Sequence, residues 1–153
     1  PPRSTLFPYT TLFRSLVTLD HTGADAAAVA HAVTLARGYR ARVLLLHVEE
    51  GVTSQVYGDE ASTAEVEAGA AYFTDWLRRV REQGVEADLV VVHGRDPKKE
   101  IIRAARALEA DLLVMGAHGH RGIKDLVYGA TINEVRHALD APVLVVRETR
   151  HPE

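Results

Sequence analysis

Three glycines in the C-terminal half of the chain are spaced in a way that suits phosphate binding. Two residues separate Gly116 from Gly119, and nine further residues lead to Gly129. Glycine lets a backbone approach an anion closely, and the free N–H groups at the start of a helix favour negative charge. Apolar residues at Ile132 and Val135 then continue at helical spacing. The pattern therefore predicts a strand, a phosphate-binding glycine loop and a helix that opens at Gly129.

The rest of the chain alternates apolar runs with amphipathic helical patterns. The apolar runs predict five strands, at residues 16–19, 43–48, 89–92, 112–115 and 142–146. The helical patterns between them lie at about residues 22–37, 66–83, 97–108 and 129–139. Such alternation predicts a single α/β domain with an open parallel sheet, right-handed crossovers and helices on both faces.

Two of these helices have recognisable capping residues at their starts. Thr22 and Asp25 have the spacing of a capping box, in which side chains satisfy free N–H groups of the first turn. Asp96 is placed to cap a later helix, with Pro97 at its first position. We therefore expect helices to begin at both places.

Composition restricts the class of protein. The 153 residues fit one globular domain, with 46% hydrophobic and 25% charged residues. A net charge of −3 is mild and of the wrong sign for nucleic-acid binding, and zero cysteines exclude a disulfide framework and thiolate metal sites. No apolar run approaches the roughly 20 residues of a membrane span, and no stretch reads as a secretory signal. We therefore expect a cytoplasmic protein without nucleic-acid or membrane partners.

The N-terminal segment differs from the rest of the chain. Residues 5–15, TLFPYTTLFRS, resemble the translation of a common sequencing-adaptor oligonucleotide. We therefore interpret residues 1–15 as a non-native segment, residues 16–148 as the domain and residues 149–153 as a tail. The alternative is a genuine short N-terminal extension.

The glycine segment resembles that of the universal stress proteins. Their nucleotide-binding branch has the same glycine spacing, with serine or threonine after the last glycine. The resemblance extends over residues 16–147 and includes the stretch Gly94-Arg95-Asp96-Pro97 and the last strand at 142–146. It implies a Rossmann-like sheet with the strand order 3-2-1-4-5. Here, however, Ala130 follows Gly129, so the hydroxyl is absent from its usual place.

The implied strand order predicts where a ligand would bind. In an open parallel sheet, ligands bind beyond the carboxyl ends of the strands where the winding direction changes, here between the first and fourth strands. Asp20 ends the first strand and Gly116 follows the fourth, so both are expected to face this crevice. The resemblance implies ATP, ADP or AMP as the ligand, with or without Mg²⁺. The nucleotide-binding residues that it implies are Thr18, Leu19, Asp20, Val48, Met115, Gly116, His118, Gly119, Gly129, Ala130 and Thr131.

Each implied contact has a simpler alternative. By the resemblance, Asp20 contacts the nucleoside and Val48 lies against the adenine, yet Asp20 could only cap a helix and Val48 could only fill the core. Ala130 lacks a hydroxyl whose hydrogen bond to a charged phosphate is worth about 1.5–3 kcal/mol. Thr131 comes next, but its side chain points about 100° away around a helix. Weakened binding and loss of binding both remain open.

Histidines gather where the predicted strands end, at His21, His47, His93, His118 and His120. Such a cluster could bind a metal or respond to pH around phosphates. Strand ends are also simply where polar residues begin, and no two of these histidines have the spacing of helical metal ligands. We therefore assign no metal ligands.

Other nucleotide-binding and catalytic motifs do not occur in the sequence. It has no P-loop, the first strand–helix turn lacks the dinucleotide-binding glycines, and no nucleophile, base and orienting residue form a series. The leading hypothesis is a stress-response regulator that binds an adenine nucleotide and hydrolyses ATP slowly at most, with no catalytic residues assigned. The alternatives are a nucleotide-independent interaction module, which Ala130 favours, and a slow Mg²⁺-dependent ATP hydrolase using Asp20.

The last strand predicts a homodimer. The resemblance implies that two copies pair this strand antiparallel across the interface. An apolar edge strand with unpaired N–H and C=O groups also invites such pairing on physical grounds. The expected interface residues are Pro142, Val143, Leu144, Val145 and Val146.

Overall fold

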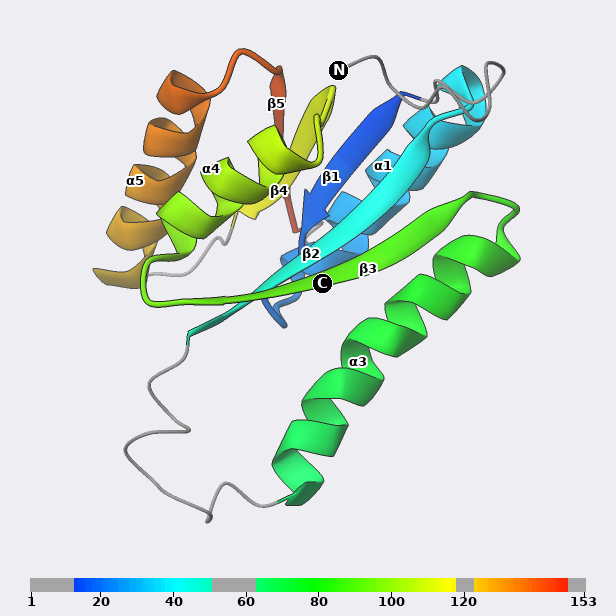
Figure 1. The fold of residues 1–153 in the computed structure, drawn as a ribbon, viewed down its shortest axis with the longest axis horizontal. Helices are drawn as coiled ribbons and strands as arrows, with labels where there is room; N and C mark the ends of the chain where they lie inside the picture. The colour runs from blue at the N-terminus through cyan, green and yellow to red at the C-terminus, as the bar shows by residue number, and fades with distance from the viewer. Residues whose placement is uncertain (1–12, 51–62, 118–122, 149–153) are drawn as a thin grey trace, which may run out of the picture.

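The computed structural model describes residues 13–50, 63–117 and 123–148 of the chain. They form one five-stranded sheet in the order β3-β2-β1-β4-β5, and all neighbouring strands are parallel. Figure 1 shows this sheet with helices on both of its faces. The predicted α/β class and the strand order 3-2-1-4-5 are confirmed.

The predicted strands are all present, with shifted ends. The strands are β1 (Arg14–Thr18), β2 (Arg42–Glu50), β3 (Ala87–Gly94), β4 (Leu112–Ala117) and β5 (Val143–Arg147). The helices are α1 (Ala24–Tyr39), α3 (Thr63–Glu82), α4 (Pro97–Ala107) and α5 (Ile123–Ala138). Because β1 begins at Arg14, the last two residues of the segment interpreted as non-native lie in the sheet.

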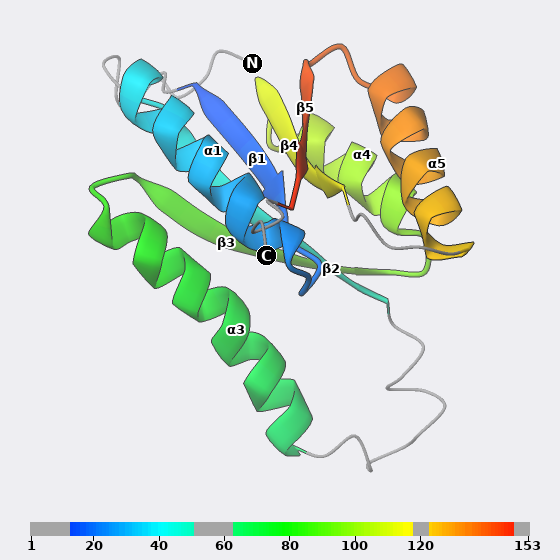
Figure 2. The same cartoon turned by 180° about the vertical axis from the view of Figure 1, so that it is seen from behind.

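Of the helices in the described residues, two cover each face of the sheet. Helices α1 and α3 lie on one face and α4 and α5 on the other, as the opposite views in Figures 1 and 2 show. Along the central strand β1, Val17 packs under α1 and Leu16 packs on the opposite face, and neither is exposed to solvent. Burial on both faces explains why the central strands read as continuous apolar runs. In the described part of the chain, no helix has the length and apolar character needed to cross a bilayer.

Helix α4 begins with the predicted capping contact, whereas α1 begins near the predicted residue without it. The Asp96 carboxylate caps α4 by accepting a hydrogen bond from the Lys98 N–H at 3.1 Å, and Pro97 is the first helical residue. Helix α1 has Gly23 as its N-cap, without a side-chain capping bond. The Asp25 carboxylate points back to the turn that precedes the helix, so the capping-box prediction is wrong.

Helix α5 also begins elsewhere than predicted. It starts at Ile123, six residues before Gly129, so the prediction that Gly129 opens the helix is wrong. The stretch from Ile123 to Tyr128 contains no glycine or proline that would delay the start. A glycine inside a helix costs only about 1 kcal/mol relative to alanine, which the helix tolerates.

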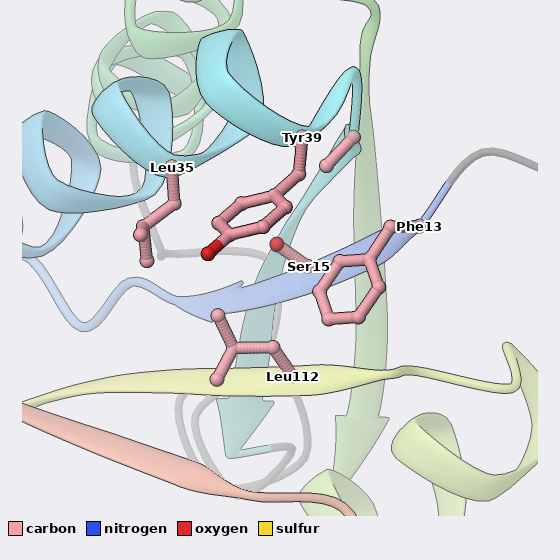
Figure 3. A pocket seen from close by; sticks show the side chains of 6 residues that line it. Phe13, Ser15, Leu35, Tyr39 and Leu112 are labelled. Carbon is pink, nitrogen blue, oxygen red and sulfur yellow. The ribbon is translucent and has the colours of Figure 1, made fainter.

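A cavity of about 260 Å³ lies between α1 and the sheet, near the start of β1. It is lined by Phe13, Ser15, Leu35, Tyr39, Ala41 and Leu112 (Figure 3). Ser15 is fully buried, and its hydroxyl has no hydrogen-bond partner among the described residues. A buried hydroxyl without a partner costs about 1–3 kcal/mol, so this position in β1 suits an apolar side chain better than serine.

We expect Ser15→Val to stabilise the protein. The change removes the unsatisfied hydroxyl and fills part of the cavity, which should raise the free energy of unfolding by about 1–2 kcal/mol. Urea denaturation measures the effect. The matched control is Thr34→Val on the exposed surface of α1, where the change should stay within about 0.5 kcal/mol. A loss of stability in Ser15→Val would show that the hydroxyl has a partner.

Candidate functional site

The carboxyl ends of β1 and β4 meet at the centre of the sheet. The chain winds from β1 through β2 to β3 in one direction, and from β4 to β5 in the other. Strand β1 pairs directly with β4, from Ser15 with Leu112 to Val17 with Val114. Beyond this pairing the chain leaves β1 for α1, whereas β4 continues to Ala117. This is the kind of switch point at which open parallel sheets bind ligands.

Three predicted site residues lie at the end of β1. Thr18 is half-buried, and Leu19 is buried with its N–H donating to the Leu46 carbonyl at 2.8 Å. Asp20 is exposed, and its carboxylate accepts a hydrogen bond from the Thr22 hydroxyl at 2.7 Å. Asp20 is the exposed residue of the three, and its carboxylate is of the chemical type that accepts a hydrogen bond from a hydroxyl or amine.

Met115 and Val48 belong to the other face of the sheet. Met115 is buried with the residues under α4 and α5, and Val48 is half-buried against the same cluster. Leu19 instead packs with the residues under α1 and α3. The predicted pocket residues therefore come from both sides of the sheet edge, and both Met115 and Val48 have a packing role that needs no ligand.

Gly116 lies where α1 begins. A side-chain carbon added at Gly116 would come within 2.7 Å of the Cβ of Ala24, the first residue of α1. Real Cβ atoms do not approach so closely, so only glycine lets α1 start directly against β4. The sequence predicted Gly116 from phosphate binding alone, because the contact with Ala24 joins segments far apart in the chain.

The remaining predicted phosphate residues are divided between described and undescribed parts of the chain. Gly129 and Ala130 are exposed within α5, and nothing lies within 4 Å of the place where a Gly129 side chain would begin. Thr131 is half-buried. His118 and Gly119 lie outside the described residues, as does His120 of the histidine cluster. The three residues that can be placed therefore lie along α5, not at its start.

A buried carboxylate that the sequence did not predict holds the turn between β1 and α1. Asp25 is only 1% exposed. It accepts hydrogen bonds from the backbone N–H groups of Asp20 at 3.2 Å and His21 at 3.0 Å, and from the Tyr72 hydroxyl of α3 at 2.7 Å. Tyr72 and Asp25 are 47 residues apart in the sequence, so no local pattern pointed to this contact.

These contacts shift the acidity of both side chains. Burial raises the pKa of Asp25 above its usual value of 3.8, and the hydrogen bonds from Tyr72 and the Asp20 amide partly counteract this shift. Burial also raises the pKa of Tyr72 to about 12, and the negative charge of Asp25 contributes in the same direction. The neutral phenol therefore donates to the carboxylate throughout the pH range in which Asp25 titrates.

Two histidines of the predicted cluster complete the surroundings of the turn. The His47 Nδ1 is 2.9 Å from the Leu19 carbonyl, which can only accept, so this nitrogen donates. The His47 ring stacks on Phe73 with ring centres 4.0 Å apart, and His21 stacks on Tyr72 at 3.8 Å. Among the described residues, no three histidine, aspartate or glutamate side chains are grouped as metal ligands.

Negative charge gathers at the start of α1. Besides Asp20 and Asp25, the carboxylate of Glu148 lies against Gly23, where an added side chain would collide with it. Carboxylates are favourable beside the N-terminal end of a helix. The same charges would repel phosphates, so this side of the crevice suits a neutral group such as a sugar or base.

Fold and site together define a class of protein: an open parallel α/β domain whose candidate ligand crevice lies between β1 and β4, with a carboxylate on the β1 side. The universal stress protein family model matches residues 13–147. The chain belongs to the universal stress protein family, as its glycine segment predicted.

Relatives and solved structures agree with this membership. The chain is 30% identical over 146 residues to the universal stress protein YxiE of Bacillus subtilis, covering 88% of this chain and 98% of the relative. It shares its fold with a universal stress protein from Archaeoglobus fulgidus solved in complex with dAMP, at 17% identity and a TM-score of 0.65, covering 88% of this chain and 97% of the other. It also resembles a universal stress protein solved in complex with cAMP, at 20% identity and a TM-score of 0.67, covering 90% and 98%.

We expect Gly116→Ala to destabilise the protein through its contact with Ala24. The new methyl group would overpack the start of α1, at a cost of about 1–3 kcal/mol in the free energy of unfolding. Ala24→Gly removes the methyl group that the new side chain would meet. The double variant, with Gly116→Ala and Ala24→Gly, should therefore lose less stability than the sum of the losses in the two single variants. Chemical denaturation of all three variants measures this coupling.

Gly129→Ala is the matched control for this experiment. It adds the same methyl group inside α5, where space is open, so it should instead gain about 0.5–1 kcal/mol. Equal effects of Gly116→Ala and Gly129→Ala would contradict a tight contact between α1 and β4.

Proposed function

We propose that this protein binds ATP or a related adenine nucleotide in the crevice between β1 and β4, and acts as a nucleotide-dependent regulator of a stress response. The observation that carries the proposal is the position of the Asp20 turn and Gly116 on the two sides of the switch point. Two proteins of the same fold that were solved with dAMP and cAMP support an adenine nucleotide as the ligand class.

The charges of the described residues suggest an orientation for the nucleotide. The Asp20 carboxylate would accept a hydrogen bond from a ribose hydroxyl or an adenine amine, and Val48 would lie against the base. The phosphates would extend away from Asp20 and Glu148, towards the glycine segment that follows β4, because like charges repel. Mg²⁺ bound to the phosphates would reduce that repulsion further. In this proposal the protein binds the nucleotide and hydrolyses it slowly at most.

Calorimetric titration with ATP and Mg²⁺ tests the proposal. The nucleotide-stripped protein should bind with micromolar affinity. Asp20→Ala should weaken binding by about 10- to 150-fold, the equivalent of one hydrogen bond to a charged group. Asp140→Ala, which removes an exposed carboxylate in the connection between α5 and β5, should bind like the parent. An Asp20→Ala variant that retained full affinity would overturn the proposed site.

A nucleotide-independent interaction module is the second candidate. Ala130 lacks the hydroxyl of the nucleotide-binding branch, and the N–H groups of residues inside a helix are committed to backbone bonds four residues back. Placement of Gly129 and Ala130 within α5 therefore favours this candidate. The Ala130→Ser variant in the same titration separates the two. Binding that appears only in this variant would indicate a site silenced by one missing hydroxyl, whereas no binding by either protein would favour the interaction module.

We further propose that two copies pair through β5 to form a homodimer. Strand β5 lies at the edge of the sheet, and Val145 on it is 41% exposed, although apolar. The Pro142 carbonyl accepts a hydrogen bond from the Leu113 N–H on β4 at 3.0 Å. Because backbone groups alternate in direction along a strand, the N–H of Val145 points away from β4, where a second β5 could accept from it. By the same alternation, the backbone groups of Val143, which is half-buried, also point outward, whereas those of Leu144 and Val146 point to β4. Val143 and Val145 would therefore supply the backbone hydrogen bonds of the interface.

Val145→Pro should therefore abolish the dimer. Proline removes the outward N–H but leaves the bonds to β4 intact, and we expect light scattering to report a monomer. The matched control is Val145→Thr, which keeps the N–H and a β-branched side chain and should remain dimeric. A dimeric proline variant would exclude this interface.

A further inference from the structure

The turn that carries Asp20 adopts a backbone conformation that needs support. His21 has a φ of 65°, in the left-handed region that non-glycine residues rarely adopt. Such residues are strained and persist where surrounding contacts hold them. Two backbone N–H groups of this turn, those of Asp20 and His21, donate to the Asp25 carboxylate. Asp25 therefore holds the turn by its backbone, immediately beside the carboxylate proposed to bind the nucleoside.

Helix α3 also supports the turn, through Tyr72, a residue that the sequence did not predict to be part of the site. The Tyr72 hydroxyl donates to the same Asp25 oxygen, Oδ2, that accepts from the His21 N–H. The Tyr72 ring also stacks against the His21 ring. Tyr72 thus contacts both the carboxylate that holds the turn and a side chain on the turn, although it is 47 residues away from Asp25 in the sequence.

The charged and titratable groups around Asp25 come from four elements. Asp20 and His21 face it from the turn, Tyr72 faces it from α3, and Glu148 lies beside Gly23 at the start of α1 after β5. His47 of β2 reaches the turn through the Leu19 carbonyl. Two amides and one phenol donate hydrogen bonds to Asp25, and the neighbouring Asp20 carboxylate acts in the opposite direction, because its negative charge raises the pKa of Asp25.

We infer that Asp25, assisted by Tyr72, is a positioning residue for the nucleotide site, and that loss of the Asp25 negative charge loosens the Asp20 turn and weakens nucleotide binding. The inference rests on the proposed function and deepens it, because it makes binding at the β1–β4 crevice dependent on a buried ionisation and on α3. Asp25 acts through the backbone and does not touch the nucleotide. An ionised carboxylate can accept from both amides strongly, whereas a protonated one forms weaker neutral hydrogen bonds.

The sign of the pH dependence distinguishes positioning from simple stabilisation. The pKa of Asp25 is raised in the folded protein, so the folded state holds this proton more tightly than the unfolded chain does. The contribution of Asp25 to stability is therefore fully present below the unfolded value of 3.8 and is lost as pH rises through the raised folded value. Nucleotide affinity should change in the opposite direction and increase as Asp25 ionises.

The first test needs no nucleotide. In an NMR titration of the free protein, the amide protons of Asp20 and His21 should shift together, with a midpoint at the pKa of Asp25. Tyr72→Phe removes a hydrogen bond that lowers this pKa, so the midpoint should move to higher pH. Tyr39→Phe makes the same chemical change at a residue of α1 that is 72% exposed and should leave the midpoint unchanged. Amides that do not titrate together, or a midpoint unaffected by Tyr72→Phe, would overturn the inference.

The second test measures ATP affinity across the same pH range. At pH values between the Asp25 midpoint of the parent and that of Tyr72→Phe, the variant should bind ATP roughly 10-fold more weakly, a loss equivalent to about 1.4 kcal/mol. At higher pH, where Asp25 is ionised in both proteins, the two affinities should become similar. Asp25→Asn should bind weakly at every pH and lose the Asp25-dependent part of the profile, while Tyr39→Phe should follow the parent.

The outcomes separate the inference from the proposed function. If the amides titrate as expected but the parent binds no nucleotide, the proposed function fails and with it the consequence for binding, while the hold of Asp25 on the turn stands. If the parent binds ATP and both Tyr72→Phe and Asp25→Asn bind as tightly as the parent at every pH, the site is retained and the positioning role is rejected.

Discussion

The candidate site depends on the burial of β1 at the centre of the sheet. Leu16 and Val17 are fully buried on opposite faces, and the strand is paired on both edges, with β2 and with β4. A strand enclosed in this way is accessible to a ligand only where it ends. After β1 the chain enters α1, whose first residue lies against Gly116 of β4. A side chain at position 116 would not fit there. The packing of α1 against the sheet therefore requires both that β1 is buried and that position 116 has no side chain.

A buried charge at this strand end then organises the turn. Removing a carboxylate from water costs several kcal/mol unless hydrogen bonds replace the lost hydration. Asp25 has three such donors, two of them backbone N–H groups that no substitution other than proline can remove. Burying this charge is costly, but its hydrogen bonds connect α1 with α3 and with the turn after β1 and hold the three in one arrangement. The surrounding carboxylates of Asp20 and Glu148 make this side of the crevice unsuited to phosphate.

Family membership explains the architecture more completely than it explains the chemistry. A shared fold determines where a crevice lies, but binding depends on individual side chains within it. Asp20 is exposed at the expected place, whereas Gly129 and Ala130 are exposed within α5. Asp20 on the β1 side of the crevice therefore favours nucleotide binding. Gly129 and Ala130 in α5 instead favour a domain that works without nucleotide.

Local interactions are what the sequence by itself determined. The apolar runs predicted all five strands, and Asp96 with Pro97 predicted the start of α4, because periodicity and capping act within a few residues. Resemblance to a family supplied the strand order, which periodicity cannot specify. Only the tertiary structure decided that Gly116 faces Ala24, that α5 begins at Ile123, and that Asp25 serves the turn before its helix. Its hydrogen bond from Tyr72 and its raised pKa arise from packing between elements distant in the chain, and no pattern of neighbouring residues encodes how deeply a carboxylate will be buried.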